Sequence, residues 1–469
     1  MLIVGGNQSA AGGFNVANSL RFNDGSPDYL SKTFAGSGNR QKQTISVWVK
    51  RGNLGTGQNI FSVYYTASIW ANFYFNSSDQ LKYYNNGGAY DLTTNRLFRD
   101  PSAWYHLVIE LNTTLATASD RIKMYVNGVQ ETSFASTTYP PLNAEVTFGD
   151  NYSHYVGTYN AGTDNFDGYM SQFYFTTNVA YDPTYFGEFD ADSGVWKPIE
   201  VTGVTFNTNA FYLSFENSAA LGQDDSGNGN NFTVNNIIST NQMTDTPTNN
   251  YCVANPLDNY YQESTFYEAG LKLRTKHPGV IYSYETYNTG TLGVTSGKWY
   301  WEIKVDAFDS GTSTIGIVDS VTTSSGTQLG QKTYGWSYNS GSGVENNGSS
   351  VSGTFASYTV GDIIGVYLDL DNNKLYFAKN GTIQNSGTGI SITDPASTGG
   401  GFYMPAFGDY NAGNVTFDLN WGNSTLTIAS SNTDANGYGN FEYDPSSGTF
   451  DGVSKDFYAL NTKNLAEFG

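Results

Sequence analysis

Short segments with alternating apolar and polar residues recur along most of the chain, which is the pattern of β-strands with one buried face. In the clearest of them, Trp299, Trp301, Ile303 and Val305 alternate with Lys298, Tyr300, Glu302 and Lys304. Similar segments lie at 19–22, 44–49, 60–65, 70–75, 104–109 and 122–126. Helical periodicity is almost absent, so the pattern predicts an all-β protein.

Clusters of Gly, Asn, Asp and Ser separate these segments, as expected where tight turns join strands. An Asn-Gly pair stands between strand residues twice, at Asn127-Gly128 and at Asn380-Gly381. Both central residues of a type I′ hairpin need positive φ, which Asn and Gly adopt most easily. The sequence therefore predicts a two-residue hairpin at each pair.

The chain has 469 residues, which is more than one hydrophobic core usually organises. We therefore expect two antiparallel β-sandwiches, whose bounds of 14–257 and 258–424 are those that the two family resemblances below imply. Residues 1–13 are rich in glycine and lack periodicity, so a flexible N-terminal arm is expected there. Residues 425–469 form a C-terminal tail.

The order of features in the first sandwich resembles a known family. The segments concerned are Leu20-Arg-Phe22, Tyr29-Leu30, Ile45-Ser-Val-Trp-Val49, Trp104-Tyr-His-Leu107, Lys123-Met-Tyr-Val-Asn-Gly-Val129 and Phe166-Asp-Gly-Tyr-Met-Ser171. In this order they resemble the laminin-G-like, concanavalin-A-like jelly roll. The fold expected for 14–257 is therefore that jelly roll.

The second sandwich resembles a different family. Its segments are Lys298-Trp-Tyr-Trp-Glu-Ile-Lys-Val305, Tyr334-Gly-Trp-Ser-Tyr338, Gly361-Asp-Ile-Ile-Gly-Val-Tyr-Leu-Asp-Leu370, Lys374-Leu-Tyr-Phe-Ala-Lys-Asn-Gly381 and Val415-Thr-Phe-Asp-Leu-Asn-Trp-Gly422. In this order they are similar to a SPRY domain. The tail, with Phe441-Glu-Tyr-Asp-Pro445, resembles the segment that follows SPRY domains in bacteriophage and marine-virus structural proteins.

The amino-acid composition argues against some classes of function. Only 14% of residues are charged but 16% are aromatic, which suits a folded chain with a polar surface. The formal net charge of −20 argues against nucleic-acid binding and against an anionic membrane surface. The sequence contains no run of about 18 apolar residues, so it predicts no membrane-spanning helix. Cys252 is the only cysteine, so it forms no intrachain disulfide and suits a small buried position.

Residues suited to catalysis are few. The histidines are His106, His154 and His277, and the alternation of His106 with Trp104 and Val108 indicates a structural placement. Nucleophile-elbow, phosphate-loop and zinc-protease motifs are absent. A glycosidase needs two carboxylates, and the nearest pair is Glu302 and Asp306. Because Lys304 lies between them on the same face, we interpret both as solvated outer-face charges and expect no enzyme.

A calcium ion is the one cofactor that the jelly-roll resemblance implies. Calcium prefers carboxylate and carbonyl oxygens, and Gly-rich loops hold four suitable carboxylates: Asp24, Asp28, Asp224 and Asp225. The alternative is that these side chains cap backbone groups of their own turns, as Asp commonly does. No cofactor is otherwise expected.

The SPRY resemblance implies a shallow ligand-binding face built from loops at one end of the sandwich. Aromatic candidates for it are Tyr282, Tyr284, Trp336, Tyr338 and Tyr410. Trp336 and Tyr338 could instead alternate inward on a core strand. Tyr410 stands between Asp409 and Asn411 and is the better surface candidate.

The combination of jelly roll, SPRY domain and tail implies a non-enzymatic virion structural protein. We expect a phage tail fibre or tail-associated adhesin that recognises a glycan or protein on the host surface. The alternative is a capsid decoration or head-fibre protein. A tail-spike polysaccharide depolymerase ranks third, because no short sequence repeat is present. The expected partners are other virion proteins and the glycan or protein on the host surface. The chain is expected to form a homo-oligomer, with a trimer favoured. The expected location is extracellular, on the virion tail or capsid surface.

Overall fold

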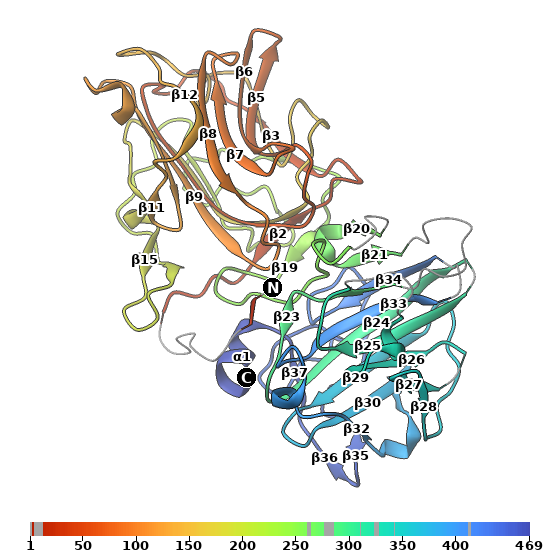
Figure 1. Cartoon of the computed structure of the whole chain (residues 1–469). Helices are drawn as coiled ribbons and strands as arrows, with labels where there is room; N and C mark the ends of the chain where they lie inside the picture. Colours follow the sequence, from red (N-terminus) through yellow and green to blue (C-terminus); the bar gives the residue numbers. More distant parts are fainter. Residues whose placement is uncertain are drawn as a thin grey trace. The chain divides into compact units, whose positions relative to one another are not determined.

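The computed structural model describes residues 2–3, 13–259, 264–275, 286–309, 311–322, 328–341, 343–410 and 414–469 (Figure 1). The chain forms two compact units, which we call the N-terminal unit (Ala11–Asn249) and the C-terminal unit (Asn250–Gly469 with Met1–Ala10). Both are built from antiparallel sheets, which confirms the predicted all-β class. Among the described residues, no helix is long and apolar enough to cross a membrane.

The first sheet of the N-terminal unit has eight strands that pair antiparallel. Its order is β11 (Val129–Gln130), β10 (Ile122–Val126), β9 (Trp104–Asn112), β4 (Lys42–Arg51), β14 (Gly168–Thr177), β2 (Ser19–Phe22) and β19 (Gln242–Met243), with β17 (Phe211–Leu213) also paired to β14. A separate hairpin joins β15 (Gly187–Phe189) and β16 (Trp196–Pro198).

The second sheet of this unit also has eight strands. Its order is β12 (Phe134–Thr138), β8 (Tyr90–Leu97), β7 (Gln80–Asn85), β6 (Ile69–Phe75), β5 (Gln58–Thr66), β13 (Ser153–Val156), β3 (Tyr29–Thr33) and β18 (Thr233–Asn235). Inward side chains of both sheets form one core, in which Phe61 stacks on Phe148 at 4.9 Å between ring centroids. The outward face of the second sheet carries aromatic as well as polar side chains.

A buried ion pair lies on the outward face of the first sheet. Lys50 Nζ lies 2.7 Å from Asp245 Oδ2, and both side chains are buried. Trp104 Nε1 donates a hydrogen bond to Asp245 Oδ1 over 2.9 Å. Because a buried charge needs a partner, these contacts hold the chain around Asp245 against β4 and β9.

The larger sheet of the C-terminal unit has nine strands. Its order is β20 (Thr265–Tyr267), β21 (Lys272–Arg274), β34 (Val415–Asn420), β24 (Lys298–Phe308), β29 (Ile363–Asp369), β30 (Lys374–Lys379) and β31 (Thr382–Ile383), with β32 (Ile390–Ser391) beside β30 and β37 (Tyr458–Ala459) parallel to β24. The C-terminal unit also contains a separate hairpin of β35 (Thr449–Phe450) and β36 (Val453–Ser454), and the helix α1 (Thr462–Phe468).

The facing sheet of the C-terminal unit has six strands. Its order is β22 (Thr286–Thr289), β33 (Met404–Tyr410), β25 (Thr312–Val318), β26 (Gly335–Asn339), β27 (Val344–Asn346) and β28 (Ser349–Val351). Of the predicted N-terminal arm, Leu2–Ile3 and Gly13 are described, and Leu2–Ile3 form the short strand β1 parallel to β23 (Leu292–Gly293). The remainder of that prediction lies outside the described residues.

The boundary between the units differs from the predicted one. Residues 250–257 were expected in the first sandwich but belong to the C-terminal unit. Tyr251 forms a β-bridge with Asn461, and Ala254 forms one with Gly290. Cys252 is buried beside them, as predicted for a small apolar side chain.

Both predicted Asn-Gly hairpins are confirmed. Asn127 and Gly128 have φ of 48° and 77°, and they join β10 to β11. Asn380 and Gly381 have φ of 48° and 76° and join β30 to β31. A Cβ atom on Gly128 would lie 2.3 Å from the ring of Trp196, so packing as well as φ requires glycine there.

The prediction of a solvated outer face on β24 is wrong for Glu302. The tail folds over this face, and its Phe441, Phe450 and Phe457 pack against tyrosines of the sheet. Ring centroids of Tyr300 and Phe441 lie 5.0 Å apart. Strand β24 is therefore buried on both faces around Tyr300 and Glu302.

Four hydrogen-bond donors surround the buried Glu302 carboxylate. Oε1 accepts from Tyr300 Oη over 2.9 Å and from the backbone N–H of Tyr443 over 2.8 Å. Oε2 accepts from Asn420 Nδ2 over 2.8 Å and from the N–H of Glu442 over 3.0 Å. Burial raises the pKa of Glu302, and these four donors oppose the rise. Glu302 thus fastens the tail to the sheet.

Candidate functional site

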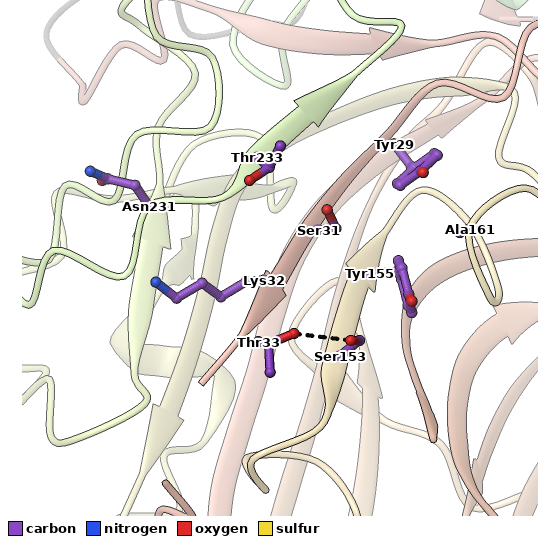
Figure 2. A pocket seen from close by; sticks show the side chains of 9 residues that line it. All are labelled: Tyr29, Ser31, Lys32, Thr33, Ser153, Tyr155, Ala161, Asn231 and Thr233. Atoms are coloured by element: carbon purple, nitrogen blue, oxygen red, sulfur yellow. Dashed lines mark hydrogen bonds between the residues drawn. The ribbon is translucent and has the colours of Figure 1, made fainter. Parts of the chain in front are cut away.

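A polar pocket of about 420 Å³ lies on the outward face of the second sheet in the N-terminal unit. Figure 2 shows the side chains that line it: Tyr29, Ser31, Lys32, Thr33, Ser153, Tyr155, Ala161, Asn231 and Thr233. They come from β3, β13, β18 and two adjoining loops. The pocket therefore spans three neighbouring strands at one end of the sheet.

Strand alternation brings most of the strand side chains to the pocket, and Lys32, between Ser31 and Thr33, is the exception. On β3, Leu30 enters the core while Tyr29 and Ser31 point outward, and on β13 the buried His154 separates the outward Ser153 and Tyr155. The two strands pair with Tyr155 directly opposite Ser31 and Ser153 opposite Thr33. Thr33 Oγ1 and Ser153 Oγ share a hydrogen bond of 2.9 Å, drawn in Figure 2.

Two half-buried tyrosines give the pocket an aromatic side. The rings of Tyr29 and Tyr155 meet edge to face, with centroids 6.0 Å apart and an interplanar angle of 64°. Hydroxyl and amide groups surround them, and Asn235 Nδ2 donates to Ser31 Oγ over 3.2 Å. An aromatic ring beside polar hydrogen-bonding groups suits a ligand with one apolar face and many hydroxyls.

The lining of this pocket suits binding rather than acid–base chemistry. Lys32 is the one charged residue among the nine described side chains that line it, and none of those nine is Asp, Glu or His. General acid–base hydrolysis of a glycosidic bond requires a pair of carboxyl groups. The pocket therefore offers contacts and hydrogen bonds but no such pair.

His106 and His154 have structural roles. The ring of His106 is buried between Trp48 and Trp196, with stacked centroids at 4.8 and 5.9 Å. Its Nδ1 accepts from Trp196 Nε1 over 3.0 Å, and its Nε2 lies 2.8 Å from Ser46 Oγ. Burial lowers the pKa of His106 to about 3, so the ring stays neutral. The predicted structural placement of His106 is confirmed.

His154 is also buried, in the core beneath β13. Its Nε2 accepts from the N–H of Gly149 over 2.9 Å, and its Nδ1 lies 2.9 Å from the carbonyl oxygen of Tyr152. Burial lowers the pKa of His154 to about 4, against smaller raising effects from Tyr152 and Asp150. The third histidine, His277, lies outside the described residues.

Each of the four predicted calcium ligands accepts hydrogen bonds from other groups of the protein, Asp24 and Asp28 from residues of other segments. Asp224 accepts backbone N–H groups of Tyr212, Ser226 and Asn230 at 3.0, 2.9 and 2.7 Å. Asp225 accepts from Gln223, Asp28 from Ser26 and Asn241, and Asp24 from Asn53. In the part of the chain that the structure describes, no three His, Cys, Asp or Glu residues form a group that could hold a metal. Of these carboxylates, Asp224 makes the backbone contacts of the turn-capping alternative, and calcium binding stays a prediction.

The aromatic residues predicted to form the SPRY binding face do not form the expected cluster at the surface among the described residues. Trp336 packs edge to face on Tyr403 at 5.7 Å and is buried, and Tyr338 is fully buried with its hydroxyl donating to the carbonyl oxygen of Ala356. Both follow the inward alternative, so Tyr338 offers no surface to a ligand. Tyr410 is half-buried at the end of β33 and keeps part of its ring accessible. Tyr282 and Tyr284 lie outside the described residues.

The sequence interpretation missed the pocket on the sheet face. Its local signal was present, because Tyr29 and Tyr155 are outward positions of alternating strands. The pairing of β3 with β13 joins positions 120 residues apart, as Thr33 and Ser153 are. A single sequence carries no local mark of that pairing, so the sequence indicated Tyr29 only as part of the jelly-roll resemblance and did not indicate Tyr155 as a candidate.

Comparisons with known proteins find one known domain in each unit. Residues 24–180 match the Concanavalin A-like lectin/glucanases superfamily, in its Laminin_G_3 model, and residues 298–420 match the SPRY domain. Domains of these two kinds are typically binding modules. No curated protein sequence matches the chain significantly.

The solved structures to which this chain is similar have low sequence identity to it. The SPRY domain of human HERC1 is 17% identical, with 38% of this chain and 99% of that chain covered and a TM-score of 0.28. A putative carbohydrate binding protein from Bacteroides ovatus is 16% identical (48% and 59% covered, TM-score 0.32), and a heptameric SAP-like pentraxin from Limulus polyphemus is 13% identical (36% and 79% covered, TM-score 0.27). With the two family matches, the described fold identifies the chain as a protein with a concanavalin A-like domain followed by a SPRY domain.

Proposed function

We propose that this protein is a glycan-binding adhesin whose sugar site is the pocket beside Tyr29 and Tyr155. The observation that carries the proposal is the edge-to-face pair of these tyrosines among hydroxyl and amide side chains. A sugar ring has an apolar face of C–H groups and a rim of hydroxyls. The tyrosine rings suit the first, and Ser31, Thr233 and Asn231 suit the second.

The wider setting that we propose is a viral particle. The jelly roll, SPRY domain and tail together resemble bacteriophage structural proteins, which supports a tail fibre or tail-associated adhesin that binds the host surface. A trimer would present three sites at once and raise the avidity above that of one pocket. Electron cryomicroscopy of the particle tests the placement: density on the tail agrees with the proposal, whereas density on the capsid lattice would make the chain a decoration protein.

Replacing Tyr155 by alanine is expected to weaken glycan binding about tenfold, because one face of the pocket loses its aromatic contact. The measurement is binding of the full chain to an array of defined oligosaccharides, followed by titration of the strongest of them. Tyr185→Ala is the matched control, since Tyr185 is exposed on the same unit but outside the pocket.

Three results would revise this proposal. If no oligosaccharide on the array binds, glycan recognition is wrong. If Tyr155→Ala and Tyr185→Ala bind the glycan equally well, the pocket is not its binding site. Release of reducing ends from a bound polysaccharide would favour the depolymerase alternative. Repeating the array with a calcium chelator tests the separate prediction of a bound calcium ion.

A further inference from the structure

A second group of aromatic side chains lies on the same outward sheet face as the pocket. We call Tyr64, Trp70, Tyr84 and Tyr159 the aromatic row. Tyr159 meets Tyr64 edge to face at 5.4 Å and Trp70 at 6.3 Å, and Trp70 meets Tyr84 at 5.0 Å. All four are half-buried, so each ring keeps accessible surface on a face that no described strand covers.

The strand register makes the aromatic row continuous with the pocket. Thr33 on β3 pairs with Ser153 on β13, Ser153 pairs with Tyr64 on β5, and Tyr64 pairs with Trp70 on β6. Thr33 and Ser153 line the pocket, while Tyr64 and Trp70 begin the aromatic row. At the usual spacing of neighbouring strands, these four positions span about 14 Å. That length exceeds one sugar ring.

Charges near the aromatic row favour an uncharged ligand. Lys82 Nζ lies 4.2 Å from the ring centroid of Tyr84 and 3.5 Å from Asp91, so its charge is already compensated. Asp91 is compensated in turn by Lys82, and the pocket itself has Lys32 as the one charged residue of its described lining. A polyanionic glycan would meet the net charge of −20 of the whole chain.

We infer that the sugar site extends from the pocket along the aromatic row and takes a neutral, linear glycan several sugars long. This inference rests on the proposed glycan-binding function and names its ligand class. Tyr29 and Tyr155 hold one end of the glycan, and Tyr64 and Trp70 stack on sugars further along it. Binding therefore increases with the length of the glycan until the row is filled.

The test is affinity electrophoresis of the full chain in gels that contain soluble neutral polysaccharides: dextran, galactomannan, mixed-linkage β-glucan and xylan. A gel that retards the protein identifies the polysaccharide, and its fragments of two and six sugars are then titrated. Trp70→Ala is expected to weaken binding of the six-sugar fragment about tenfold and to leave the two-sugar fragment unchanged. Trp70→Phe keeps an aromatic ring and is expected to lose less affinity for the six-sugar fragment than Trp70→Ala.

The outcomes separate this inference from the function on which it rests. If Tyr155→Ala abolishes retardation but Trp70→Ala binds the six-sugar fragment like the unmodified chain, the extension is wrong and the pocket stands. If no gel retards the protein while the array shows binding, the neutral ligand class is wrong and the proposed function stands. If the array is silent as well, or if Tyr155→Ala and Tyr185→Ala behave alike, the proposed function fails and the extension with it. Melting temperatures of each variant show whether the fold is intact, and Tyr64→Ala repeats the test at a second ring of the row.

Discussion

Glu302→Gln will destabilise the C-terminal unit by about 2–4 kcal/mol, although the two side chains have nearly the same shape. Both carboxylate oxygens accept two hydrogen bonds each, from Tyr300, Asn420 and the backbone of Glu442 and Tyr443. Glutamine replaces one oxygen with an NH₂ group, so donors face donors at a buried position. The tail then loses its attachment to β24, and the tyrosines beneath it become exposed to solvent.

Hydrogen exchange of peptides from β24 and from the tail measures this effect, because both should exchange faster in the variant. Asp306→Asn is the matched control on the same strand. Asp306 pairs with Lys272 at 2.6 Å, but both side chains are about one-third exposed, so its loss should cost no more than about 1 kcal/mol. Equal protection of the tail in Glu302→Gln and in the unmodified chain would contradict the proposed role of Glu302.

Acidification will destabilise the N-terminal unit through His106 and His154 well before most carboxylates are protonated. Burial lowers the pKa of His106 to about 3 and that of His154 to about 4, below the ordinary value of about 6.5. The unfolded chain therefore binds protons that the folded chain excludes. The stability is complete above about pH 6.5 and falls with pH below that, by up to about 1.4 kcal/mol per pH unit for each histidine.

Urea unfolding between pH 7 and pH 5 measures this loss, which should reach roughly 4 kcal/mol for the two rings together. His154→Gln should reduce the dependence on pH by about half, since only His106 remains to take up a proton on unfolding. NMR titration of the histidine ring signals is the independent check. A His106 signal that titrates near pH 6.5 in the folded chain would contradict this explanation.

Local pattern was sufficient for the parts of the fold that depend on neighbouring residues. Alternation placed Trp299 and Trp301 in a core, and the Asn127-Gly128 and Asn380-Gly381 pairs marked hairpins that the structure contains. The order of strands supported the concanavalin A-like and SPRY assignments, which the family matches confirm. These features need no knowledge of which distant strands pair.

The rest depends on contacts between segments far apart in the chain. Glu302 alternates with core residues and has the pattern of a surface charge, but the tail covers it with backbone donors from 442 and 443. Tyr29 and Tyr155 become neighbours only when β3 pairs with β13. The predicted SPRY site was chosen from the aromatic residues in the expected loops. Tyr338, which is fully buried, shows that such residues also fill the core of a sandwich.

The most direct test of the account is a crystal structure of the chain soaked with the oligosaccharide that the array selects. We predict sugar density against the rings of Tyr29 and Tyr155, with hydrogen bonds to side chains that line the pocket. Density that lies only on the SPRY domain, for example beside Tyr410, would contradict the assignment of glycan binding to the outward face of the concanavalin A-like domain.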